Sequence, residues 1–82
     1  MGRIRLKFFA RYAELVGADE RELSVVLPAT VADVVRRARD EIPGAGAIPE
    51  RPLAAVNLRH VQLDAPVADG DEVALLPPLA GG

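Results

Sequence analysis

The sequence predicts a single α+β domain in which one main helix packs on a mixed β-sheet. Three observations indicate this fold class: the first segment alternates at the period of a strand, a central segment is apolar at helical spacing, and a late segment is apolar on both faces. A chain of 82 residues, half of them apolar, supports one hydrophobic core. We expect one domain, residues 1–76, followed by a flexible C-terminal tail, residues 77–82.

The N-terminal part predicts a strand, a short helix and a second strand. Residues 3–8 alternate basic with apolar side chains, as a half-buried strand does. Residues 10–16 are helix formers, and they precede Gly17, which can end a helix in the left-handed conformation. Residues 22–27 alternate again, and Pro28 ends this second strand because it cannot donate to a ladder.

The main helix begins at a capping signal, in which Thr30 is followed three residues later by Asp33. Apolar side chains then recur at helical spacing, at Val31, Val34, Val35, Ala38 and Ile42. The polar face carries Arg36, Arg37 and Arg39, which we interpret first as a solvated surface; contact with an acidic partner is the alternative.

The C-terminal half predicts a loop and three strands. Residues 43–52 are rich in proline and glycine and form the loop. Residues 53–57 and 60–63 are short apolar runs with a tight reversal near Asn57. Residues 72–76 are apolar on both faces, so we expect a central strand that pairs with the first strand.

The interior of the chain offers no set of residues for catalysis or metal binding. Cysteine is absent, and His60 is the only histidine, without partners at metal-ligand or triad spacing. The acidic residues Asp69, Asp71 and Glu72 are explained more simply by a turn before a strand than by a metal or acid/base site. We therefore expect no bound cofactor and no metal.

Charge and hydropathy exclude further classes. The net charge is −2 and the basic residues are scattered, which argues against a nucleic-acid surface. The basic N-terminus is not followed by a long apolar run, so neither a signal peptide nor a membrane span is expected. We predict a soluble cytoplasmic protein without membrane contact.

The C-terminal sequence LLPPLAGG is the candidate functional segment. Pro77 and Pro78 fix two φ angles and remove two N–H donors, so the chain should leave the sheet in an extended course. Gly81 and Gly82 have no side chains, and a narrow channel on another protein could therefore close around them. A carboxylate at Gly82 is an anion at neutral pH and must be activated, for example by adenylation, before it can react.

Four segments carry a resemblance to a known family: KFFARYAELVG (7–17), LAAVN (53–57), DGDEVALLPP (69–78) and the final Gly81-Gly82. Together they resemble the MoaD/ThiS sulfur carriers, which include the small subunits of molybdopterin synthases. The resemblance implies a β-grasp, ubiquitin-like fold. It also implies that Gly82 is adenylated, is converted to a thiocarboxylate and donates sulfur to cyclic pyranopterin monophosphate in molybdenum cofactor biosynthesis.

The same resemblance implies partners and their contacts. The partners are the large synthase subunit, in a heterotetramer, an E1-like adenylyltransferase and a sulfur donor, with ATP and sulfur supplied through the activating enzyme. Gly82 carries the sulfur and Gly81 permits passage into the channel. The expected partner contacts are Phe8, Leu75, Leu76, Pro77, Pro78, Leu79 and Ala80. A carrier for thiamine or tRNA thiolation, a ubiquitin-like modifier of lysines and an interaction module with an inert tail remain the alternatives.

Overall fold

The computed structural model describes residues 1–78, and residues 79–82 lie outside the described part. Strands and helices follow one another in the order β1 (Gly2–Phe8), α1 (Arg11–Val16), β2 (Glu20–Val25), β3 (Ala29–Thr30), α2 (Val31–Glu41), the 3₁₀ helix η1 (Ala45–Ala47), β4 (Leu53–Val56), β5 (Arg59–Val61), β6 (Pro66–Val67) and β7 (Glu72–Leu76).

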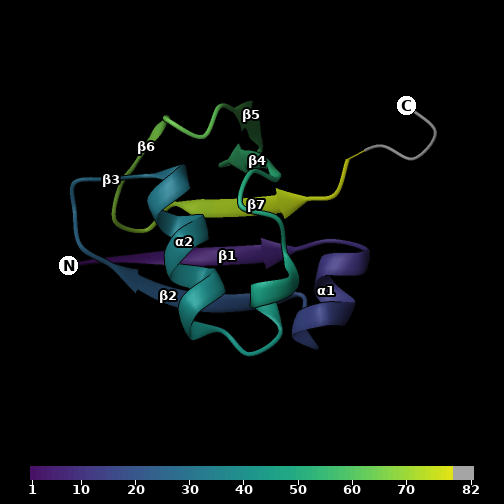
Figure 1. The fold of residues 1–82 in the computed structure, drawn as a ribbon. Coiled ribbons are helices and arrows are strands. Elements are labelled where there is room, and N and C mark those ends of the chain that lie inside the picture. The colour runs from purple at the N-terminus through teal and green to yellow at the C-terminus, as the bar shows by residue number, and fades with distance from the viewer. Residues whose placement is uncertain (79–82) are drawn as a thin grey trace.

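Five of the strands form one mixed sheet in the order β2-β1-β7-β4-β5, and α2 crosses one face of it (Figure 1). The central pair β1 and β7 is parallel, whereas the β1/β2, β4/β7 and β4/β5 pairs are antiparallel. The short strands β3 and β6 form a second, two-stranded sheet. This arrangement is a β-grasp fold, and it confirms the α+β prediction of a sheet packed on one main helix with an additional short helix.

The core lies between α2 and the inner face of the five-stranded sheet. From β1, alternate residues point inward and are at most 2% exposed; from β7, Val73 and Leu75 do the same. The helix contributes the apolar positions that its spacing predicted. The largest fully buried side chains are Phe8, Ile4, Leu6, Ile48, Leu75, Val31, Val34, Val35 and Val73.

Two predicted partner contacts, Phe8 and Leu75, are core residues. Their exposed fractions are 2% and 1%, and their Cα atoms are register partners in the parallel pair of β1 and β7. Because successive side chains of a strand point to opposite faces, this placement turns Leu76 outward. The surface expected near Phe8 and Leu75 is therefore formed by their neighbours in the chain.

Several element boundaries differ from the sequence prediction for reasons of pairing. β2 covers Glu20–Val25 rather than 22–27, because β1 begins at Gly2 and Gly2 already pairs with Val25. β5 ends at Val61, opposite Ala54, near the start of β4. The predicted loop 43–52 contains η1, and the β3/β6 pair was not predicted.

The loop after α2 is anchored by Arg39 and by a close backbone approach at Gly44. Arg39 donates from Nε to the carbonyl oxygen of Ile48 at 2.7 Å and from Nη2 to that of Gly46 at 3.3 Å. Gly44 has a φ of 88°, and a Cβ there would overlap the carbonyl oxygen of Leu15. These contacts set the path of the chain from the end of α2 toward β4.

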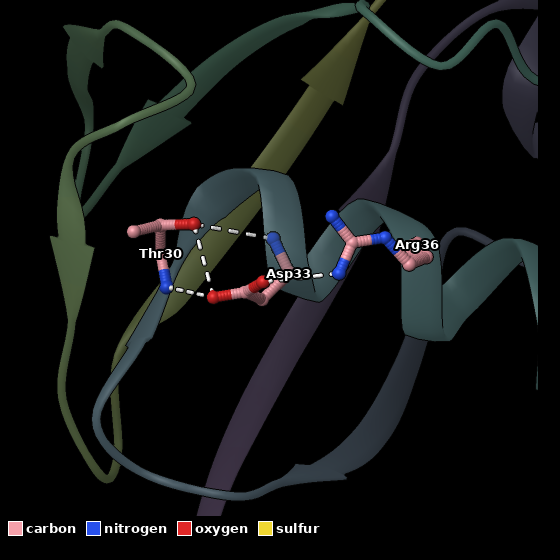
Figure 2. Close-up of polar contacts among 3 residues, drawn as sticks. All are labelled: Thr30, Asp33 and Arg36. Carbon is pink, nitrogen blue, oxygen red and sulfur yellow. Dashed lines mark hydrogen bonds and ion pairs between the residues drawn. The ribbon is translucent and has the colours of Figure 1, made fainter.

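The N-terminus of α2 has the predicted capping box (Figure 2). The Asp33 backbone N–H donates to Thr30 Oγ1 at 3.3 Å, and Asp33 Oδ2 accepts from the Thr30 backbone N–H at 2.9 Å. Arg36 donates to Asp33 Oδ1 at 3.2 Å. Hydrogen bonds from Thr30, backbone first, and the nearby Arg36 charge hold the pKa of Asp33 below its ordinary value, although desolvation opposes them.

We expect Thr30→Ala to lower the free energy of unfolding by about 1 kcal/mol at pH 7, because it removes the side-chain cap. Asp33→Asn should also destabilise, with a pH dependence set by the lowered pKa in the folded state. The stabilisation by the carboxylate is complete above its unfolded pKa, near 3.9, and is lost as the pH falls through the folded value. Urea unfolding at pH 7 and at decreasing acidic pH measures both effects.

The control for this prediction is Asp40→Asn, which removes an exposed carboxylate of α2 outside the cap. The difference in stability between the wild type and Asp33→Asn should shrink as the pH falls below about 4. A difference that stays constant or grows would contradict the role of the ionised cap.

A second stability prediction compares Phe8 with Phe9. Phe8→Ala should lower the free energy of unfolding by about 3–5 kcal/mol, because it opens a cavity in the core. Phe9, which is 44% exposed, should tolerate the same change at a much smaller cost. Thermal or urea denaturation of the two variants checks the assignment, and equal losses would show that it is wrong.

Candidate functional site

The candidate site begins where the chain leaves the centre of the sheet. β7 ends at Leu76, next to the end of the parallel strand β1, and the chain continues outward from there (Figure 1). Pro77 is half-buried and Pro78 is exposed. The predicted site residues Leu79, Ala80, Gly81 and Gly82 lie outside the described residues. The structure thus describes the first two residues of the tail, Pro77 and Pro78, which we call the tail root, and the surface around them.

That surface is the outer sheet face, the side of the five-stranded sheet that faces away from α2. Its middle consists of Ala55 and Ala74, which are register partners and are each 8% exposed. Neither alanine belongs to the cluster of core side chains, whereas their neighbours Ala54 and Leu75 do. Lys7 borders this pair on one side, opposite Ala74, and His60 borders it on the other, opposite Ala55.

The outer sheet face carries an apolar lobe beside the tail root, formed by Phe9, Leu53 and Leu76. Leu53 pairs with Leu76 across β4 and β7 and is 49% exposed. Phe9 is 44% exposed and directly follows Phe8, the last residue of β1 and the register partner of Leu75, so we group it with Leu76 at this end of the sheet. Of these three residues, the sequence analysis named only Leu76 as an expected partner contact. The alternation of β1 could have identified Phe9, but the pairing of Leu53 depends on long-range register.

The acidic residues before β7 have structural roles. Asp69 Oδ1 accepts from the Arg3 backbone N–H at 2.7 Å. Asp71 accepts from the Ala68 backbone N–H at 2.8 Å and from Asn57 Nδ2 at 3.0 Å. The turn before β7 was predicted from the sequence, and these bonds, which were not, connect it to β1 and to the β4–β5 hairpin. Within residues 1–78, no group of three or more potential ligands is placed to hold a metal ion.

The arginines of α2 are paired within the domain. Arg36 contacts Asp33, Arg37 contacts Glu41, and Arg39 contacts Glu50 at 3.5 Å in addition to its bonds to the loop. Surface grooves of about 570 and 430 Å³ flank this helix, and no residue of β7 lines either of them. The grooves therefore lie apart from the tail root.

None of the helices within the described residues is both long and apolar enough to cross a membrane. The larger of the two α-helices, α2, has 11 residues and is amphipathic, with its apolar side against the sheet. That length is well below the roughly 20 residues that a membrane span needs.

Comparison with known proteins identifies the family. The model of the ThiS family matches residues 6–82. The molybdopterin synthase sulfur carrier subunit of Escherichia coli K12 is 41% identical over 80 residues, which cover 96% of this chain and 99% of that protein.

Solved structures share the fold. A crystal structure of the small archaeal modifier protein 1 of Haloferax volcanii superposes with a TM-score of 0.82 at 26% identity, over 96% of this chain and 100% of that one. A chain in the complex of subunits 1 and 2 of the molybdopterin-converting factor from Helicobacter pylori has a TM-score of 0.66 at 22% identity, over 98% and 99% of the two chains. With a family match that spans nearly its whole length, this chain belongs to the ThiS family.

Proposed function

We propose that this chain is the sulfur carrier subunit of a molybdopterin synthase and that the carboxyl group of Gly82 carries the sulfur. The observation that carries the proposal is the full-length match to the E. coli sulfur carrier subunit. The position of the tail supports it, because Pro77 and Pro78 follow directly on a central strand held by two neighbours.

The proposed chemistry takes place at the carboxyl carbon of Gly82. A carboxylate oxygen attacks the α-phosphorus of ATP on an E1-like enzyme, and pyrophosphate leaves. A sulfide equivalent from a sulfur donor then attacks the acyl carbon, and AMP leaves to give a thiocarboxylate. On the large synthase subunit the thiocarboxylate sulfur attacks a carbon of cyclic pyranopterin monophosphate and displaces an oxygen substituent, which gives a thioester between Gly82 and the pterin. Water then cleaves the acyl–sulfur bond, so the sulfur stays on the pterin and Gly82 returns to a carboxylate.

In this proposal, the folded domain holds the tail in position for the partner. β7 is hydrogen-bonded to β1 on one side and to β4 on the other, which fixes the position of Leu76. From Pro77, six residues reach up to about 20 Å, enough to enter a pocket while the domain stays outside. The apolar lobe of Phe9, Leu53 and Leu76 surrounds the tail root, so we propose it as the docking surface for the large subunit.

A ubiquitin-like modifier is the second candidate, because the structural similarity to the small archaeal modifier protein 1 favours it. Both functions use the same acyl adenylate, but an amine replaces the sulfide in a modifier. Incubation with ATP, sulfide and an activating enzyme, followed by intact-mass measurement, separates them. A carrier gains one sulfur in exchange for one oxygen, and a modifier forms adducts on lysines of other proteins. An unchanged mass would contradict both functions.

We expect Gly81→Leu, or one alanine added after Gly82, to abolish sulfur transfer while the melting temperature stays nearly unchanged. The reason is that a side chain or an extra residue blocks the narrow channel or displaces the reacting carbon, whereas the core side chains of the described residues all lie between Ile4 and Leu75 in the sequence. The matched control adds the same alanine before Met1. Normal transfer by either tail variant would contradict the proposed threading of the tail.

A further variant tests the docking surface. Leu76→Asp should weaken binding to the large subunit by at least about tenfold, or ~1.4 kcal/mol, because docking would bury an unpaired charge. The control is Val26→Asp, since Val26 is 64% exposed and lies just beyond β2, outside the apolar lobe. Calorimetric titration measures both affinities, and melting curves show that both variants are folded. Equal affinities would contradict docking at this lobe.

A large subunit that binds neither the wild type nor the variants would contradict the molybdopterin assignment and favour a carrier for thiamine or tRNA thiolation.

A further inference from the structure

The charged side chains of the outer sheet face are paired with one another across strands. The N···O distances in these three ion pairs are 3.5 to 3.9 Å, so each positive charge lies against a negative one. The pairs join Arg3 with Glu22, Arg5 with Glu20, and Lys7 with Glu72. As a result, these six side chains together contribute no net charge at neutral pH. A face of this kind fits an uncharged, apolar partner surface better than a strongly charged one.

His60 is the titratable side chain of this face that takes no part in those ion pairs. Its register partner Ala55 pairs in turn with Ala74, so the exposed imidazole lies beside this pair of alanines in the middle of the outer sheet face. Leu53 of the apolar lobe is its diagonal neighbour on β4, within about 8 Å between Cβ atoms. A partner that covers Leu53 therefore reaches His60 as well.

The surroundings of His60 offer a protonated imidazole little compensation. Within residues 1–78, β5 is an edge strand that pairs with β4 alone, and the residues of β4, Leu53–Val56, are all apolar. On β5 itself, Arg59 lies opposite Val56 and so points to the other face. Gln62 and Asp64, in the segment that follows β5, line the groove beside α2. Lys7 lies three strands away, about 14 Å, beyond the screening length of about 8 Å in physiological salt.

Two carboxylates lie at the turn next to the β4–β5 hairpin, and both are engaged. Asp71 accepts from Asn57 and from the backbone of Ala68, and Glu72 pairs with Lys7. Among residues 1–78, no carboxylate forms an ion pair with His60, so its protonation adds a charge to the face that the three ion pairs leave uncompensated. In the free protein water solvates this charge, but an apolar partner would remove that water.

We propose that His60 is a specificity-determining residue of the outer sheet face, which accepts an apolar, uncharged partner surface only while the imidazole is neutral. The proposal rests on the proposed function, because its partner is the large subunit of the synthase. Docking removes His60 from water and disfavours its charged form, so formation of the complex at mildly acidic pH releases a proton. One pH unit below the midpoint of the free imidazole titration, the affinity should be about tenfold lower than at pH 8.

Two measurements test the proposal on the full chain with a purified large subunit from the organism that encodes it. The first is calorimetric titration from pH 8 to pH 5.5, in buffers of different ionisation enthalpy, which gives both the affinity and the number of protons released. The second is NMR. Because the chain has a single histidine, its imidazole signals in the free protein are unambiguous, and labelling this chain alone gives its titration in the complex.

The matched variant is His60→Gln, which keeps a polar side chain of similar size but does not titrate. The readout is the ratio of the dissociation constants at low and high pH for each protein. This ratio should be about tenfold larger for the wild type than for His60→Gln, because titration of the large subunit contributes equally to both. The imidazole midpoint should also move to lower pH on binding.

The outcomes separate the two proposals. The role of His60 would be overturned by equal ratios for the wild type and the variant, or by an imidazole midpoint that does not move to lower pH in the complex. In either case, binding at pH 8 would still support the large subunit as the partner. Binding that strengthens as the pH falls would also overturn it, since it would show an acidic partner group at His60. Absence of binding at pH 8 would instead refute the large subunit as the partner.

Discussion

The structure depends on the parallel pairing of β1 with β7 at the centre of the sheet. These two strands come from opposite ends of the chain, and their ladder runs from Arg5 and Glu72 to Phe8 and Leu75. Parallel pairing places the ends of both strands at the same edge of the sheet. The C-terminal tail therefore leaves from a position held by strands on both sides, and the large residues that follow β1 and begin β4 surround its root.

The alternation of side chains in these strands separates the residues that stabilise the core from those of the outer sheet face, which we propose as the docking surface. Phe8 and Leu75 are packed beneath α2, whereas Phe9 and Leu76, the next residues along the chain, belong to the outer sheet face. The end of each strand thus provides one side chain to the core and is followed by or includes one on the outer sheet face. A substitution on the outer face can change binding with a limited effect on folding, because the cavity cost of truncation belongs to the inner residues.

Sequence patterns predicted the elements well, and the surface less well, for a physical reason. The alternation of β1, the capping box at Thr30 and Asp33, and the glycine after α1 are local signals, and each has the expected counterpart in the structure. β7 is apolar on both faces, so its own pattern could not show which of Leu75 and Leu76 points inward. The placement of Phe8 on the surface was an error that the alternation of β1 already argued against. Long-range register decides the position of Leu53, and the two-residue strands β3 and β6 have no period to detect.

If the chain acts as the proposed sulfur carrier, the pairing of charges on the outer sheet face also affects how it binds several partners in succession. A carrier must leave the activating enzyme before it can dock on the synthase, so a very long-lived complex at either stage would stop the cycle. Charges that are paired within the face give little long-range attraction to any one partner, which leaves the affinity to short-range apolar contacts. Because those contacts lie around the tail root, a partner gains most of its binding energy only when it is placed to receive the tail. Docking and presentation of Gly82 are then coupled by geometry, without a conformational change in the domain.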